Sequence, residues 1–236
     1  MDVMEEIRQL AAELQREIDK FVDTVNDTLR RIPDWAGWVR DRLMAAWGDF
    51  TDEVAELWQK FDEEMFHPGY PGELSATANQ WNTDVGGPVS SQVGTVQAGQ
   101  LAVDDHWQGS AADKYRQHLS PQASAMDKIK TSLTAGITSA LDKMQGAITV
   151  FWWAFAGALA ALIVGIIGAA ASAATVFGLP ASPFIGAGAC SVFITAIFAA
   201  GEHKAREARS ANTILIDKMN DLGAFPGGSW PRATLS

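Results

Sequence analysis

The sequence predicts an all-α protein in which long helical hairpins form a bundle and a C-terminal two-helix hairpin lies in a membrane. Apolar residues recur at steps of three or four over residues 3–32 and again over residues 35–65, which is the period of an amphipathic helix. Pro and Gly gather in a few short segments that can end helices. Residues 144–201 contain no Asp, Glu, Lys, Arg or His.

Residues 1–66 are predicted to form an N-terminal amphipathic helical hairpin. The first helix ends near Pro33, because proline cannot continue the hydrogen-bond ladder. Asp34 suits the N-cap of the second helix, whose apolar stripe is largely aromatic. Two antiparallel helices joined by a short turn are the simplest arrangement of such a pair.

Residues 67–72 form a predicted linker, with two Pro and two Gly in six positions. A second hairpin is expected over residues 73–145, with its turn at residues 104–109. Pro71 suits the first turn of the opening helix. Residues 126–144 then carry a narrow apolar seam with coiled-coil spacing.

Residues 147–201 are predicted to form a two-helix transmembrane hairpin. Its arms cover residues 147–177 and 184–201, and they meet at a turn that contains Pro180 and Pro183. A bilayer-spanning helix needs roughly 20 apolar residues, so the first arm is long enough and the second is marginal. The alternative interpretation is a hairpin buried in the core of a helical bundle that does not enter a membrane.

Residues in and around the arms agree with a membrane location. Trp152 and Trp153 lie near the start of the first arm, where aromatic side chains anchor at the headgroup level. Small residues, among them Gly157, Gly165 and Gly168, allow two helices to approach closely in lipid. Lys and Arg flank the arms but not the turn, which predicts that both ends of the hairpin are cytoplasmic.

The second arm continues without a breaker into a predicted C-terminal helix over residues 202–223. Residues 224–236, rich in Pro and Gly, are predicted to be a flexible tail.

Charge and composition exclude several classes of function. The net charge is −10, and residues 1–66 alone hold 17 acidic and 8 basic residues, so nucleic acid is an improbable partner. The four histidines and the single cysteine are scattered along the chain and match no metal-ligand or catalytic spacing. The sequence therefore predicts a protein that is not an enzyme, with no metal, no cofactor and no small-molecule substrate.

Trp107-Gln108-Gly109 stands at the turn between two predicted amphipathic helices. Trp81 lies on the helix before that turn, and Tyr115 opens the helix after it. With these flanking residues, the region 70–145 resembles the WXG (ESAT-like) family of helical-hairpin proteins, which are associated with type VII (ESX) secretion in actinobacteria and their relatives. Trp35-Ala36-Gly37 repeats the pattern in the first hairpin, which could be a diverged copy that pairs with the second hairpin in one four-helix bundle.

The resemblance implies a non-enzymatic secretion-associated protein that acts by helix–helix recognition. Its expected partners are another WXG-like chain, a second copy of itself or the secretion machinery, together with membrane lipid. The family's export motif is Tyr followed four residues later by Asp or Glu, and here Leu74 and Leu119 occupy the positions that follow Tyr70 and Tyr115. A partner would therefore supply the export motif, or the chain stays in the membrane of the producing cell.

Two other functions fit the same sequence. One is a membrane-permeabilising effector whose amphipathic helices keep the Gly/Ala-rich hairpin in solution until it inserts into a target membrane. The other is a structural assembly protein of long helices with no role in secretion.

Overall fold

A computed structural model describes residues 3–66, 69–96 and 107–232. No strand occurs in these residues, which confirms the all-α class. The α-helices have the following bounds: α1 Val3–Leu29, α2 Gly37–Phe66, α3 Pro71–Gln80, α4 Gly87–Gln92, α6 Ser110–Lys128, α7 Ala135–Ala173 and α8 Ser182–Met219. Short 3-10 turns are η1 Asp34–Ala36, η3 Val93–Val96, η6 Leu179–Ala181 and η7 Pro226–Gly228, and π-helices are η2 Trp81–Gly86 and η5 Ile129–Thr134.

The chain divides into two compact units. Unit 1 consists of Met1–Gly69 and Ile148–Lys204, and unit 2 of Tyr70–Ala147 and Ala205–Ser236. The long helices α7 and α8 each contribute one part to each unit. The domains predicted from the sequence are consecutive segments of the chain. In the structure, the N-terminal hairpin and most of the apolar hairpin belong to the same compact unit.

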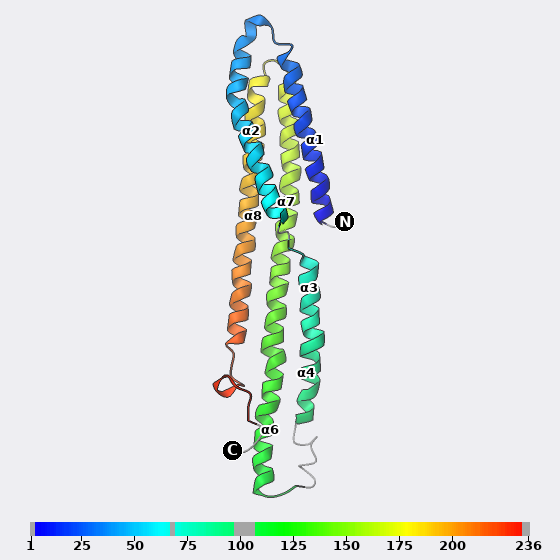
Figure 1. Cartoon of the computed structure of the whole chain (residues 1–236), viewed down its shortest axis with the longest axis vertical. Helices are drawn as coiled ribbons and strands as arrows, with labels where there is room; N and C mark the ends of the chain where they lie inside the picture. The colour runs from blue at the N-terminus through cyan, green and yellow to red at the C-terminus, as the bar shows by residue number, and fades with distance from the viewer. Residues whose placement is uncertain (1–2, 67–68, 97–106, 233–236) are drawn as a thin grey trace. The chain divides into compact units, whose positions relative to one another are not determined.

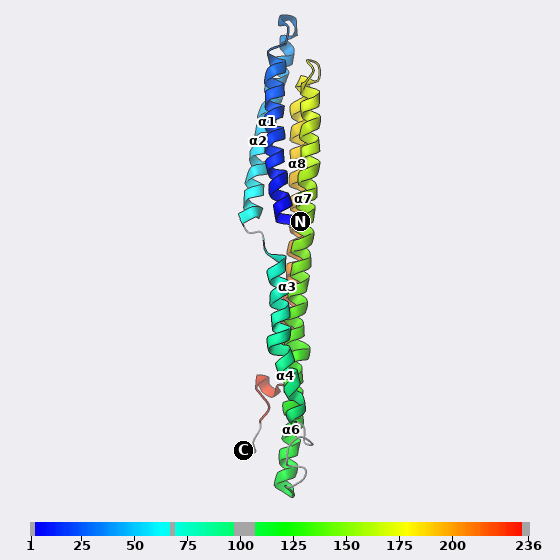
Figure 2. The ribbon, with the colours of Figure 1, turned by 90° about the vertical axis from the view of Figure 1, so that its right-hand side faces the viewer.

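Unit 1 has two layers, one made of α1 and α2 and the other of α7 and α8 (Figures 1 and 2). The amphipathic stripe of α1 is buried at Ile7, Leu14 and Phe21. Phe61 of α2 lies 5.6 Å from Phe155 of α7, and Phe155 lies 5.5 Å from Phe193 of α8, measured between ring centroids. Two amphipathic helices alone cannot shield wide apolar stripes, so the inner faces of α7 and α8 complete the core.

The two arms of the apolar hairpin touch where small residues meet. A Cβ placed on Gly165 of α7 would lie 2.5 Å from Cβ of Ala189 on α8. The turn between the arms is held by its own hydrogen bonds, since Ser172 Oγ donates to Gly178 O over 3.0 Å and Ser182 Oγ donates to Leu179 O over 2.8 Å. Pro180 and Pro183 are both buried in this turn, and η6 also packs against α2.

Unit 2 places α3 and α4 beside the continuous helix formed by α6, η5 and the start of α7 (Figure 1). The two π-helices pack against each other. A Cβ on Gly86 would lie 2.9 Å from Cγ2 of Thr134, so the helices approach closely at this point. The end of α8 belongs to the same unit, because Lys143 of α7 forms a 3.0 Å ion pair with Glu207.

The substitution Gly165→Leu should separate the two arms. Overpacking of a tight contact costs about 1–3 kcal/mol, so we expect a lower midpoint of chemical unfolding by circular dichroism in a mild detergent. Gly168→Leu on the same helix is the matched control, because a Cβ there meets nothing within 4 Å. Equal effects of the two variants would show that the arms do not depend on this contact.

Candidate functional site

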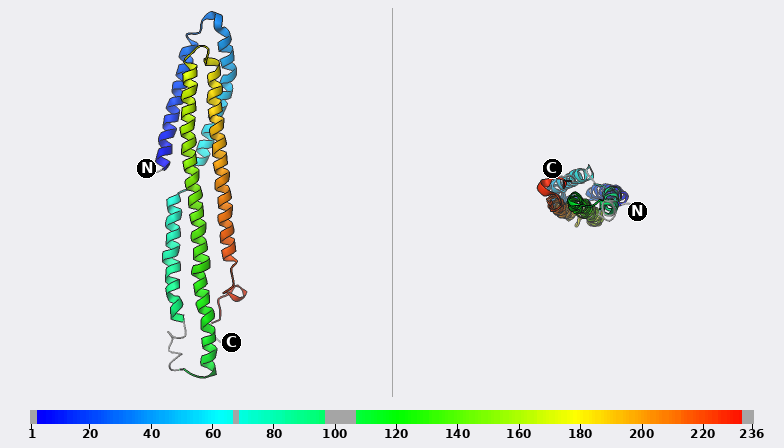
Figure 3. Two further views of the ribbon diagram at one scale, coloured as in Figure 1. Left: turned by 180° about the vertical axis from the view of Figure 1, so that it is seen from behind. Right: turned by 90° about the horizontal axis from the view of Figure 1, so that it is seen from below.

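The outer face of the apolar hairpin is a surface of unit 1 that has no charged side chain. Figure 3 (left) shows α7 and α8 in front, with α1 and α2 behind them. Because residues 144–201 contain no Asp, Glu, Lys, Arg or His, every exposed residue of the arms is uncharged. The large exposed apolar side chains of the arms are Val150, Trp153, Val164, Ile167 and Phe177 in the first arm, and Phe184, Ile185, Val192 and Phe198 in the second.

The burial of the hairpin lies between that of a soluble core and that of a free membrane hairpin. In the most apolar window of each long helix, 44 % of the first and 22 % of the second is buried within the chain. Both helices are long and apolar enough to cross a membrane by length and composition. In both helices, fewer than half of the residues in this most apolar part are buried within the chain.

The two tryptophans at the start of the first arm face in different directions. Trp152 is fully buried and packs edge-on against Phe151 and Phe155. Trp153 is exposed on the outer face. Of the two expected headgroup anchors, Trp153 is the one whose ring lies on the surface. Gly157 and Gly168 also lie on this face, whereas Gly165 lies between the arms.

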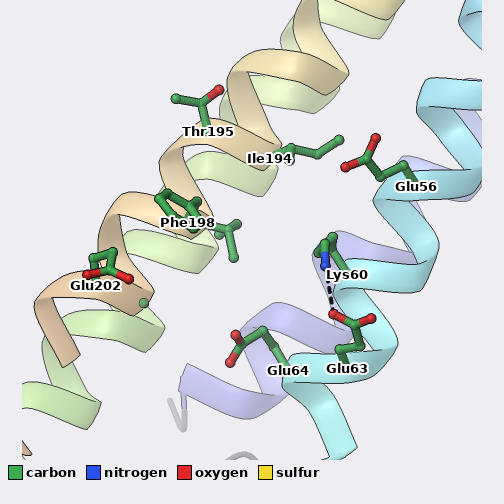
Figure 4. Close-up of a pocket in the computed structure, with 10 residues that line it drawn as sticks. Glu56, Lys60, Glu63, Glu64, Ile194, Thr195, Phe198 and Glu202 are labelled. Carbon is green, nitrogen blue, oxygen red and sulfur yellow. Dashed lines mark hydrogen bonds and ion pairs between the residues drawn. The ribbon is translucent and has the colours of Figure 1, made fainter. Parts of the chain in front are cut away.

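An ionised cleft borders the apolar hairpin between α2 and α8 (Figure 4). It encloses about 420 Å³, and its walls include Glu56, Lys60, Glu63, Glu64 and Glu202 beside the apolar side chains of α8. Lys60 Nζ donates a 2.9 Å hydrogen bond to Glu63, which raises the pKa of Lys60 and lowers that of Glu63. Both groups therefore remain charged at neutral pH. Glu202, the first charged residue after the uncharged part of α8, lies in the wall of the same cleft.

Lys204 joins the two layers at this end of the hairpin. Its ammonium lies 3.0 Å from Glu64 Oε2 on α2 and 3.9 Å from the ring centroid of Phe151 on α7. A cation over an aromatic face adds to the ion pair. Lys204 thus connects α8 to both α2 and α7 just outside the uncharged segment.

The Trp-x-Gly turn lies in unit 2 at the start of α6. Gly109 has φ 104° and ψ 177°, a conformation that is essentially restricted to glycine. The rings of Trp107 and Tyr115 lie 5.6 Å apart, and an Arg116 guanidinium nitrogen donates to Trp107 O over 3.1 Å. Trp107 nevertheless keeps 43 % of its surface exposed.

The structure brings together three of the four residues that the motif singled out. Trp81 stands apart, because it begins the π-helix that packs against Ile129–Thr134. The first hairpin has a different turn: Trp35 is 71 % exposed, and Gly37 is helical with φ −55°. The helices of the first hairpin belong to unit 1 together with the apolar hairpin, whereas the Trp107 turn belongs to unit 2.

The C-terminal segment has contacts that the sequence did not suggest. Lys128 and Ser132 of unit 2 both bond to Asp221, with Lys128 as the larger influence, and they lower the pKa of its carboxyl. Trp230 Nε1 donates to Gln122 Oε1, and Gln122 Nε2 donates to Pro231 O. Residues 221–231 are thus held against α6 and η5, while residues 233–236 of the predicted tail lie outside the described part.

His67, Asp104, Asp105 and His106 also lie outside the described residues. Within the part of the chain that is described, no three His, Cys, Asp or Glu side chains are grouped to hold a metal ion. Comparisons of the chain with protein-family models, with curated proteins and with solved structures found no match.

The substitution Gly109→Ala tests the turn. A Cβ at this φ is strained, and we expect a loss of about 1–3 kcal/mol in the free energy of unfolding, together with weaker fluorescence coupling of Trp107 to Tyr115. Gly146→Ala is the control, because that glycine is helical with open space at its Cβ and alanine there is expected to be neutral or stabilising. A Gly109→Ala protein as stable as the Gly146→Ala control would contradict the conclusion that this turn requires the positive φ of a glycine at residue 109.

Proposed function

We propose that this chain is a non-enzymatic membrane protein of the type VII (ESX) secretion class, which inserts its α7–α8 hairpin into a lipid bilayer and binds a helical partner through unit 2. The observation that carries the membrane half is the outer face of the hairpin. Transfer of this surface into hydrocarbon desolvates no charged group. Its exposure to water, in contrast, is unfavourable for every Val, Ile and Phe side chain on it.

The flanking charges support a topology with two spans. Lys143 precedes the uncharged segment, and Lys204 and Arg206 follow it, while the turn at residues 178–183 has no basic residue. Under the positive-inside rule both ends lie in the cytoplasm and the turn lies on the opposite side. The charged cleft beside Glu202 agrees with a membrane boundary there.

The partner-binding half rests on the WXG resemblance and on the exposed aromatic turn. The Trp107 ring is large, rigid and partly open, which is typical of residues that anchor a helix–helix interface. The partner in this proposal is another amphipathic helical hairpin, supplied by a WXG-like chain, by a second copy or by the secretion machinery.

Charges placed on the outer face should prevent insertion without disturbing unit 1. Val164 and Val192 are 69 % and 66 % exposed, so Val164→Lys and Val192→Lys leave the core intact. A lysine at the centre of a membrane helix costs about 2.5–3.5 kcal/mol, and we expect the double variant to lose its carbonate-resistant membrane fraction.

Met44→Lys on α2 is the matched control, because Met44 is 61 % exposed but lies outside the hairpin. It should fractionate with membranes as the unsubstituted protein does. Retention of the double Val→Lys variant in the carbonate-resistant pellet would refute the membrane assignment.

A membrane-permeabilising effector is the second candidate, and it is favoured by the way α1 and α2 shield the inner face of the hairpin. Neither arm has a polar stripe that could line a water-filled pore, so we expect little release of a dye trapped in phosphatidylcholine vesicles. Release at protein-to-lipid ratios that saturate binding would instead favour the effector.

A further inference from the structure

The α1–α2 layer cannot accompany the hairpin across a bilayer. Its outward side exposes many ionised residues along its length, among them Arg16, Asp23, Arg40, Asp49 and Asp52. A charged side chain at the centre of a membrane is costly, and here the charges are numerous and close together. The arrangement in which α1 and α2 pack on α7 and α8 is therefore incompatible with a spanning hairpin.

The contact between the layers is apolar and shaped to fit. Gly186 of α8 receives the ring of Phe50 from α2 and that of Phe21 from α1, since a Cβ at residue 186 would lie 2.8 Å from Phe50 Cε2 and 3.5 Å from Phe21 Cε1. Cys190, one helical turn further along α8, is fully buried. Acyl chains can replace such a partner, because they solvate apolar side chains equally well.

We propose that the α1–α2 hairpin is a removable cover, and that a lipid surface displaces it from the inner face of α7–α8 when the hairpin inserts. This inference rests on the proposed membrane function. The released cover is strongly amphipathic, so it can lie in the headgroup region with its charged side in water. The Lys204–Glu64 ion pair holds the closed form at the end of the cover that precedes Gly69.

The first experiment cross-links the cover to the hairpin in the full-length chain. Phe50→Cys and Gly186→Cys, which replace two residues that meet in the interface away from the Gly69 end, are introduced with Cys190→Ala, and the two thiols are joined by a short bifunctional thiosulfonate that a reductant cleaves. Insertion into phosphatidylcholine vesicles is measured as a carbonate-resistant, protease-protected fragment that spans residues 147–201. We expect the cross-linked protein not to insert, and the same sample to insert after reduction.

The outcomes separate the two proposals. Equal insertion before and after reduction refutes the removable cover and leaves the membrane function standing. Failure of both forms to insert, with the unsubstituted protein also failing, refutes the membrane function and the cover with it.

The second experiment needs no lipid. The variant Gly186→Leu forces the rings of Phe50 and Phe21 away from α8, whereas Gly188→Leu adds the same volume where a Cβ meets nothing within 4 Å. Cys190 is the single thiol of the chain, so its alkylation by a maleimide reports how often the cover opens. We expect labelling about tenfold faster in Gly186→Leu than in Gly188→Leu, which corresponds to about 1.4 kcal/mol.

Equal labelling rates in the two variants would show that the cover does not control access to the inner face, and would overturn the inference. If labelling is faster and insertion into vesicles rises in parallel, both steps of the proposal are supported. The Gly188→Leu control also excludes added apolar surface as the cause of any gain in insertion.

Discussion

Residues 144–201 fold into two helices that contain no acid, base or histidine, and each of these helices must satisfy two different neighbours. Their inner faces meet the aromatic rings of α1 and α2, while their outer faces expose large apolar side chains such as Val164 and Val192. The contact of Gly165 with Ala189 holds the arms against each other, so the pair presents its two faces as one body. An asymmetric sandwich results, charged on the α1–α2 side and apolar on the other.

This asymmetry explains why the burial values fit neither simple category. A soluble four-helix bundle exposes polar residues on all of its helices, and a free membrane hairpin has no internal partner for its inner face. Here the inner rings Phe155 and Phe193 are enclosed while Val164 and Phe198 are open. A protein with one exposed apolar face of this kind is expected to cover that face, either by self-association or by contact with lipid.

The sequence predicted most of the helices but not their partners. Pro71 begins α3, and the turn around Pro180 separates α7 from α8, because these rules act over a few neighbouring residues. An apolar stripe shows that one face of a helix is buried and does not show what covers it. Lys204 and Glu64 are 140 positions apart, and no local pattern connects them. Likewise, adjacent Trp152 and Trp153 looked equivalent in sequence, and the pairing of the layers alone decides that one is core and the other surface.

The facing π-helices of unit 2 have a consequence for alignment. Each π-turn holds an additional residue and so rotates the apolar stripe that follows it relative to the stripe before it. Because Trp81–Gly86 and Ile129–Thr134 pack against each other, the two rotations lie side by side. A shift of one helix by a single turn would place a π-turn opposite an α-helical turn. It would also move Thr134 away from Gly86, where the two helices approach closely. The two facing π-helices therefore fix the axial register of the two helices that contain them.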